Sequence, residues 1–284
     1  MRRLPFLALV AGLSAMPALA EPTPGTTSMP SAEDVANRNI VTVALGPAWM
    51  PDYEGSNDYR IVPAGALRGR YHGIAFTTQG PYLYVDLVPQ SGKLDLDAGP
   101  LAGLRMGTRR HIKDKVVELL PHRNYAIEVG AFAGITLHGL TNPYDALALH
   151  VDVAHDIANA HRSTVISPNF TFSTPLSPRT YASLTGAVEF VSDRYADYYF
   201  SITPTDSAAT GGVLPAFDAS GGMKDWKLGL TLAQSVTGNL LGGLSVFGYA
   251  QYSRLLGDFR RSPIVSQRGS PSQWTLSAGL AYTW

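Results

Sequence analysis

The stretch WTLSAGLAYTW, residues 274–284, ends the chain and decides the fold. Its alternate residues form two rows, because a strand points successive side chains to opposite faces. The first row is apolar with aromatic ends and the second is small or polar: Trp274, Leu276, Ala278, Leu280, Tyr282 and Trp284 against Thr275, Ser277, Gly279, Ala281 and Thr283. A tilted strand of about 9 to 11 residues crosses a bilayer. The stretch therefore predicts the closing strand of an outer-membrane β-barrel.

The beginning of the chain is consistent with a protein that is exported to the outer membrane. Residues 1–20 combine Arg2 and Arg3 with an apolar run from Leu4 to Leu13 and the small-residue ending Ala18-Leu19-Ala20. These are the three regions of a secretory signal peptide. The apolar run is too short to span a membrane as a helix, so an anchor is the weaker interpretation.

The composition also favours a barrel over a soluble domain. Hydrophobic residues make up 45% of the chain and charged residues only 15%, whereas about a quarter of an ordinary soluble domain is charged. A barrel resolves this conflict, because its apolar residues face lipid. Without the leader the chain has 20 basic and 22 acidic residues, and no basic excess indicates a nucleic-acid partner. The chain has no cysteine, which excludes disulfides, thiol nucleophiles and thiolate metal sites.

The rest of the chain predicts an all-β fold, a closed antiparallel transmembrane β-barrel of about twelve strands. Residues 21–39 are rich in Pro, Ser and Thr and are expected to form a flexible periplasmic tail. The barrel is expected over residues 40–284. The expected strands lie near 40–49, 60–69, 71–78, 82–88, 94–108, 125–138, 144–154, 163–174, 181–191, 226–232, 244–255 and 274–284.

Loop length supports an even number of strands, as bacterial barrels have. The connections after odd strands are long and those after even strands are short or marked by Gly and Pro. The long ones are 50–59, 109–123, 155–162, 192–224 and 256–272. Gly80-Pro81 is an exception, because this short connection follows an odd strand; a miscounted hairpin there would give ten or fourteen strands. Residues 109–123 have a helix-like spacing, and residues 195–202 are expected to extend the ninth strand or start a flap.

One polar cluster has residue types that could form a chemical site. His150, Asp152, His155 and Asp156 lie close together in sequence, but only His150 and Asp152 share a strand face, and His155 is expected in the following loop. A metal site or a Ser-His-Asp hydrolase needs its residues to converge. Strand alternation explains the cluster without either.

Two loops carry charged residues that could bind ions or lipid phosphates. Asp52, Glu54 and Asp58 offer oxygen ligands for calcium, but their spacing does not match an EF-hand loop. The last outward loop carries a group of arginines, Arg254, Arg260, Arg261 and Arg268. Arginine suits lipopolysaccharide phosphates through its bidentate geometry. We assign no catalytic, cofactor-binding or metal-binding residue, and we expect no cofactor.

Four segments resemble the MipA/OmpV family of outer-membrane proteins. They are GPAWMPDYEGSNDYRIVP at 46–63, DAGPLAGLRMGTRR at 97–110, EVGAFAG at 128–134 and RLLGDFRRSPIVSQRGSPSQWTLSAGLAYTW at 254–284. The resemblance covers roughly residues 41–284, although Trp284 stands where Phe is more usual. It implies a barrel in the Gram-negative outer membrane, and a non-enzymatic scaffold that joins a membrane-bound lytic transglycosylase to a peptidoglycan synthase. The family has no established catalytic residues that could be transferred to this chain.

Two other functions stay open. The small residues of the second row in 274–284 are compatible with a small-solute pore, and a hydrolase near His150 and Asp152 is the least favoured. Other expected partners are outer-membrane lipid and lipopolysaccharide.

Overall fold

The computed structural model describes residues 38–89, 92–107, 109 and 112–284. The expected signal peptide at 1–20 and most of the expected tail at 21–39 lie outside this part of the chain. The described residues form twelve strands: β1 Ile40–Pro51, β2 Tyr59–Tyr71, β3 Ile74–Gln79, β4 Tyr82–Asp86, β5 Leu94–Arg105, β6 Ala126–His138, β7 Ala146–Asp156, β8 Thr164–Ser177, β9 Thr180–Val191, β10 Gly222–Ser235, β11 Gly243–Leu255 and β12 Ser272–Thr283.

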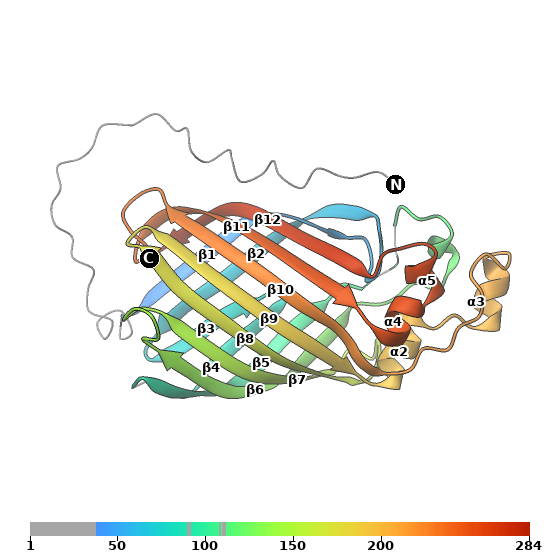
Figure 1. Cartoon of the computed structure of the whole chain (residues 1–284), viewed down its shortest axis with the longest axis horizontal. Helices are drawn as coiled ribbons and strands as arrows, with labels where there is room; N and C mark the ends of the chain where they lie inside the picture. Colours follow the sequence, from blue (N-terminus) through green and yellow to red (C-terminus); the bar gives the residue numbers. More distant parts are fainter. Residues whose placement is uncertain (1–37, 90–91, 108, 110–111) are drawn as a thin grey trace. The chain divides into compact units, whose positions relative to one another are not determined.

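The strands form one closed barrel (Figure 1). Each strand pairs antiparallel with its neighbours in sequence, and β12 closes the barrel against β1. The hydroxyls of Thr42 and Thr283 meet across this seam at 2.9 Å. Closure removes the unpaired edges that lipid does not tolerate. The expected fold class is confirmed, and so is the strand count, since Gly80-Pro81 is a real two-residue turn between β3 and β4.

The two rows of the last strand are confirmed. Along β12 the side chains alternate between exposed and less exposed, with Leu280 55% exposed and its neighbour Ala281 8%. The same alternation gives the other strands exposed apolar residues such as Ile61, Leu96 and Val151. The outer surface of the barrel is therefore apolar, as a lipid-facing surface must be.

Aromatic side chains border this apolar surface at both ends. Near the loop-rich end, Tyr252 packs between Trp226 and Trp274, with ring centroids 5.3 and 5.1 Å away. Trp49 and Tyr59 stack at 3.9 Å nearby. Tyr282 and Trp284 pack together at the opposite end, 4.7 Å apart. Aromatic rings favour the two membrane interfaces, so these rows mark the borders of the bilayer core.

One part of the barrel wall is low. β3 has 6 residues and β4 has 5, while the other strands have 11 to 14. Backbone pairing between β2 and β3 covers only Arg68–Tyr71. At the next residue of β2, the Leu67 amide donates to the Thr78 hydroxyl at 2.9 Å. Pro63 lies beyond this point, in the half of β2 that β3 does not reach. Proline is tolerated in a strand where no partner needs its amide.

Short helices gather at the outward end of the barrel, the end that carries the long connections (Figure 1). They are η2 Val117–Leu119, α2 Asp193–Phe200, α3 Pro204–Ala209, α4 Gly257–Arg261 and α5 Pro263–Ser266. No helix among the described residues combines the length and the apolar character that a membrane crossing requires.

One expectation about the loops is wrong, and another holds only in part. Residues 195–202 neither extend β9 nor form a flap, since most of them belong to α2. The buried members of α2 are Tyr195, Ala196, Tyr199 and Phe200, a spacing that places them on one helical face. Of the short helix expected within 109–123, the described residues form the single 3₁₀ turn η2. There Asp114 accepts hydrogen bonds from the amides of Val116 and Val117.

Candidate functional site

The outward loops fold into a cap with its own hydrophobic core. Buried residues from the loops and from the outward ends of the strands pack into one cluster: Tyr53, Ile112, Val117, Leu120, Val165, Val191, Tyr195, Ala196, Tyr199, Phe200, Ile202, Leu214, Ala219, Leu255, Phe259, Ile264 and Val265. Tyr195, Phe200 and Val265 are completely buried. Loops that only connect strands on a surface do not bury such residues. The outward end of the barrel is therefore covered by a packed layer.

Hydrogen bonds join the first and last outward loops within this cap. The amide of Gly55 donates to Gln273 Oε1 at 2.9 Å, and the amide of Ser270 donates to the Gly55 carbonyl at 2.8 Å. Gly55 has a positive φ of 97°, which glycine adopts without strain. The Ser262 hydroxyl donates to the Phe200 carbonyl at 2.6 Å. These bonds connect loops that are far apart in sequence.

A β-bulge places a lysine beneath the cap. Met223 pairs with Phe190 and Asp225 pairs with Glu189, so Lys224 is an extra residue in β10. Strict alternation from Trp226 would put Lys224 on the lipid-facing row. The bulge turns it inward, as bulges commonly re-aim side chains, and the Lys224 side chain is 0% exposed.

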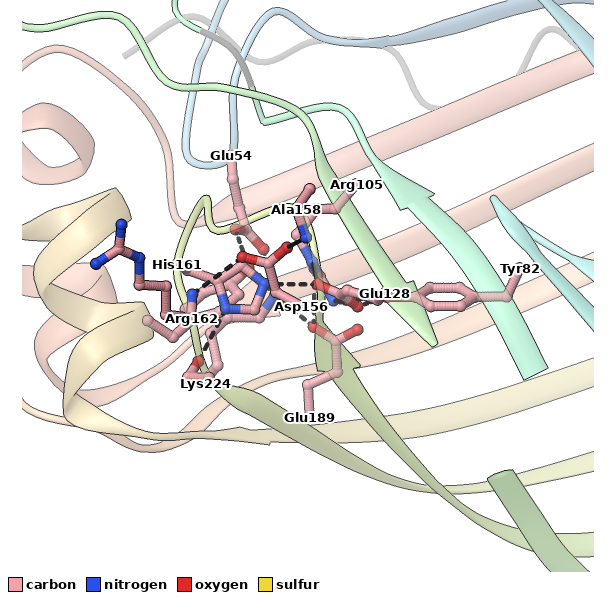
Figure 2. Close-up of polar contacts among 12 residues, drawn as sticks. Glu54, Tyr82, Arg105, Glu128, Asp156, Ala158, His161, Arg162, Glu189 and Lys224 are labelled. Carbon is pink, nitrogen blue, oxygen red and sulfur yellow. Dashed lines mark hydrogen bonds and ion pairs between the residues drawn. The ribbon is translucent and has the colours of Figure 1, made fainter. Parts of the chain in front are cut away.

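Lys224 is the centre of a buried ionic network (Figure 2). Its ammonium forms ion pairs with Glu54 of the first loop and Glu189 of β9, and with Asp225 at 3.2 Å. It also donates to the Tyr195 hydroxyl of α2 at 3.3 Å. The three carboxylates lie close enough together to hold a metal ion, but the lysine ammonium already supplies their positive charge. This network connects a loop, two strands and a helix.

Glu128 anchors a second part of the network (Figure 2). It faces inward from β6, accepts from Arg105 Nε at 2.7 Å and also bonds the Tyr82 hydroxyl. His161 Nε2 lies 2.9 Å from Glu128 Oε1, and His161 Nδ1 lies 2.9 Å from the Ser163 hydroxyl. Arg105 is also 3.7 Å from Glu189. The two parts are thus one continuous set of charges.

The Ser163–His161–Glu128 chain has the connectivity of a catalytic triad. Glu128, however, is already paired with Arg105, and Ser163 and His161 are 5% and 2% exposed. The rings of Tyr195 and Tyr199 pack against His161, with centroids 5.0 and 5.9 Å away. These contacts favour a structural role, in which His161 fixes the loop between β7 and β8 to the cap.

Burial and charge shift the pKa of several groups in the cap. Burial alone would raise the pKa of the Glu54 carboxyl, but Lys224 and Arg105 outweigh it and hold this pKa below its ordinary value. Burial raises the pKa of the Tyr195 and Tyr199 hydroxyls. Burial and the nearby Arg123 lower the pKa of Arg109 to about 9. At neutral pH, Glu54 is therefore ionised and the two tyrosines are neutral.

A separate polar group lines the lumen on β4 to β8. Asp97 lies 2.9 Å from His150 Nε2 and accepts from the Thr136 hydroxyl at 2.5 Å. Asp152 accepts from the Tyr84 hydroxyl and from the Asn169 amide, both at 2.8 Å. These residues alternate with lipid-facing apolar side chains, which is the pattern of a barrel interior.

The structure does not bring the predicted polar cluster together. His150 and Asp152 share the lumen-facing side of β7, as expected. The expectation for His155 is wrong, because β7 continues to Asp156. His155 therefore lies within the strand on its lipid-facing row, where His155 Nδ1 is 2.9 Å from the Thr164 hydroxyl. Asp156 faces the lumen and accepts hydrogen bonds from the backbone amides of Ala158 and Arg162.

The charged loop residues do not converge either. Asp52 accepts from the Lys113 amide at 3.1 Å, whereas Glu54 pairs with Lys224. Neither joins Asp58 in the kind of carboxylate group that could hold calcium. Of the arginines expected to meet lipopolysaccharide, Arg261 pairs with Asp258 and Arg268 pairs with Asp114 at 2.9 Å.

The lumen is crossed near its inward end. The Arg68 guanidinium of β2 donates to the Tyr181 hydroxyl of β9 at 2.8 Å. These strands are not neighbours in the barrel order, so the contact spans the interior. The interior is thus bridged here as well as beneath the cap.

Sequence reasoning missed the residues of the buried network. Arg105, Glu128, Glu189 and Lys224 are charged residues within otherwise alternating strands, close to their outward ends. For three of them, that position was the available signal. Arg105, Glu128 and Glu189 lie on the lumen-facing rows, where a charged residue near the loops favours contact with them. Lys224 gave no such signal, because strict alternation puts it on the lipid-facing row.

A closed antiparallel barrel with an apolar outer surface between aromatic borders defines an outer-membrane β-barrel protein. Residues 43–284 match the family described as MltA-interacting protein MipA. The chain belongs to the MipA family. Its family and its barrel fold are similar to those of non-enzymatic outer-membrane proteins. No curated protein matches the sequence.

Several solved outer-membrane proteins have a similar arrangement. An anion-selective porin from Comamonas acidovorans is 13% identical with a TM-score of 0.34, and the alignment covers 84% of this chain and 59% of the porin. An outer membrane channel from Pseudomonas putida F1 is 11% identical with a TM-score of 0.39, over 93% of this chain and all of the channel. The toluene transporter TbuX from Ralstonia pickettii is 10% identical with a TM-score of 0.33, over 86% of this chain and 88% of TbuX.

Proposed function

We propose that this outer-membrane barrel is a non-enzymatic scaffold for murein-processing enzymes. It would bring a membrane-bound lytic transglycosylase together with a peptidoglycan synthase, as the family resemblance implies. The family description names an interaction with MltA, and we transfer that class of partner to this chain.

The capped outward end carries this proposal. A passive pore needs a continuous aqueous path, but here a hydrophobic layer covers one end and the Lys224 network lies beneath it. Moving the cap would expose buried apolar surface and separate buried charges, and both changes cost free energy. These features favour a barrel that offers a binding surface to other proteins, rather than one that conducts solutes.

The partner surface is expected on the inward turns, because murein enzymes work in the periplasm. These turns include 72–73, 139–145, 178–179 and 236–242. They are short, and a partner would contact their exposed side chains, which include the polar Thr141 and Arg179 and the apolar Leu140 and Val236. The expected periplasmic tail at 21–39 would add a further contact for these partners.

Site-specific photocrosslinking tests the proposal. A photoreactive residue is placed at Arg179 of an inward turn, and a matched control is placed at Asp206 of the outward helix α3. We expect the Arg179 position to capture a lytic transglycosylase and a peptidoglycan synthase in intact envelopes, and the Asp206 position to capture neither. Capture of neither enzyme from any inward turn would overturn the scaffold proposal.

The alternative function, a small-solute pore, is tested in parallel in planar bilayers. We expect the wild-type protein to stay closed, because the cap covers the outward end and the network lies beneath it. Stable ion conductance by the wild-type protein would favour the pore.

A serine-reactive phosphonate probe tests the non-enzymatic assignment. We expect no labelling of the wild-type protein, because Ser163 lies inside the cap. Labelling that disappears in Ser163→Ala would instead identify a hydrolase.

A further inference from the structure

A cleft of about 650 Å³ opens where the outward ends of β7, β8 and β9 meet the loops. Its lining includes His155, Arg162, Thr164, Ile166, Phe190 and Arg194. None of these six residues belongs to the Lys224 network or to the cap core, but the lining also includes Ser163, which bonds His161, and Val191 of the cap core. The cleft therefore lies at the edge of the cap.

The lower part of the cleft is apolar and faces lipid. Ile166 and Phe190 are paired across β8 and β9 and are 43% and 41% exposed. They continue the lipid-facing rows of these strands, where Leu184 is also exposed. Apolar side chains at this position contact the acyl chains of the outer leaflet.

The upper part of the cleft is basic. Among the residues that the structure describes, the guanidinium groups of Arg162 and Arg194 have no ion-pair or hydrogen-bond partner. Figure 2 shows the Arg162 guanidinium directed away from the buried network. By contrast, Arg261 and Arg268 have carboxylate partners. The two free guanidinium groups can therefore bind an external anion.

The position of Arg162 is fixed by its backbone. Its φ is +51°, a conformation that side-chain-bearing residues rarely adopt. Its amide donates to Asp156 Oδ2 at 3.0 Å. Asp193, the acidic residue of the cleft lining, accepts from the Gly221 amide at 2.7 Å. The backbone thus places Arg162 at the cleft, and one oxygen of the Asp193 carboxylate is bound by the Gly221 amide.

We propose that this cleft binds the phosphate-bearing headgroup of an outer-leaflet glycolipid. The guanidinium groups of Arg162 and Arg194 would hold phosphate through charge-assisted, bidentate hydrogen bonds. The Thr164 hydroxyl and the His155 ring border the headgroup, and the acyl chains extend along Ile166 and Phe190. This inference rests on the outer-membrane barrel and not on the scaffold function.

The position of the cleft agrees with this occupant. The aromatic border of the outer surface lies on β10–β12, β1 and β2. On β8 and β9 the basic cleft lies at the outward ends of the strands, next to Ile166 and Phe190. Positive charge directly above an acyl-facing surface matches a lipid that carries phosphate directly above its acyl chains.

Binding measurements on the full-length mature protein in neutral detergent micelles test the proposal. The probes are diphosphorylated lipid A, the same lipid without phosphates, and inorganic phosphate alone. The variant is Arg162→Gln with Arg194→Gln. The comparison variant is Arg260→Gln, an exposed arginine of the last outward loop that the sequence suggested as a lipopolysaccharide contact but that lies outside the cleft. Unchanged heat-dependent gel migration shows that each variant is folded.

We expect the wild-type protein and Arg260→Gln to bind diphosphorylated lipid A equally. The double variant should bind it at least about tenfold more weakly, because two charge-assisted contacts are lost. The lipid without phosphates should bind wild type as weakly as diphosphorylated lipid A binds the double variant. Saturable binding of inorganic phosphate with a comparable affinity would assign the cleft to a free anion and overturn the lipid proposal. Equal affinity of the double variant and wild type, or an equal loss in Arg260→Gln, would also overturn it.

Discussion

Lys224 connects several elements at the outward end of the barrel. It contacts the first loop, β9, β10 and α2. A buried charge with one partner removed is costly, because the remaining charges stay without water and without compensation. Three carboxylates depend on this one ammonium, together with Lys227 at the edge of the network.

We expect Lys224→Met to lower the free energy of unfolding by about 3 to 5 kcal/mol, the usual cost of breaking a buried ion pair. The matched control is Lys227→Met on the same strand. Lys227 pairs with Glu189 at 2.6 Å but its side chain is 25% exposed, so water can replace it at a smaller cost. Denaturant unfolding in lipid vesicles measures both. Equal losses from the two changes would show that the buried ammonium is not the centre of the network.

A second residue-level prediction concerns the middle of β12. Ala278 faces lipid and its neighbour Ser277 faces the lumen, and both side chains are small. Ala278→Arg should cost about 2 to 4 kcal/mol because it places a charge at mid-membrane, whereas Ser277→Arg places the same charge in the polar interior. Ser277 also loses a hydrogen bond to the Pro47 carbonyl, so its cost is small but not zero. Folding yield and unfolding free energy in vesicles would be compared, and a larger loss from Ser277→Arg would contradict the assigned faces.

Gly279 is unsuitable for the same comparison, although it lies on the inward row. A Cβ there would lie 2.1 Å from the Leu45 carbonyl oxygen, and a Cβ at Gly46 would lie 2.1 Å from the Ala278 carbonyl oxygen. Backbone cannot move aside as a flexible side chain can. The seam between β1 and β12 therefore depends on two glycines that allow a close approach.

At the scale of elements, the cap should be sensitive to acid. The pKa of Glu54 is lowered as described above. Burial would raise the pKa of Asp114, but the Arg268 contact and the amides of Val117 and Val116 lower it. Both carboxyls have a lower pKa folded than unfolded. Their contribution to stability is fully present above the unfolded-state values near 4.5 and 3.8 and is lost as pH falls through the folded-state values.

We therefore expect the outward loops to loosen below about pH 4 while the barrel stays folded, since its strands are held by the backbone ladder. Brief pepsin digestion at stepped pH values measures cleavage in 192–221 and 256–271. The variant Glu54→Gln with Asp114→Asn should lose this pH dependence, because neither group then titrates. Cleavage that rises equally in wild type and variant would show that other groups control the cap.

The elements also show what sequence could predict. Strands such as β12 and β6 were predicted because lipid on one side and water on the other impose strict alternation. The bulge at Lys224 breaks this alternation, and only the partner carboxylates on Glu54 and Glu189 explain why. The helix α2 was missed because its stability comes from packing against residues of other loops, and tertiary packing overrides local propensity. The same reason hid the network around Glu128.

At the scale of the whole molecule, closure should give a fold that resists detergent. The contacts across the seam join residues 241 positions apart, so the barrel forms or opens as a unit. We expect a β-dominated circular dichroism spectrum in detergent, and different gel migration for unheated and heated samples, since only closed barrels and helices satisfy backbone polar groups in lipid. A helix-dominated spectrum, or identical migration, would contradict a closed barrel.

The low wall at β3 and β4 gives the molecule a direction within the plane of the membrane. Six residues of β3 extend about 20 Å, less when tilted, against an apolar band of about 25 Å in such barrels. Lipid beside this hairpin must thin to match the wall, at a cost of fractions of a kcal/mol per Å. Neighbouring proteins with an equally short wall would share that thinned patch and reduce its cost. The barrel therefore favours one side for its neighbours without any direct contact between them.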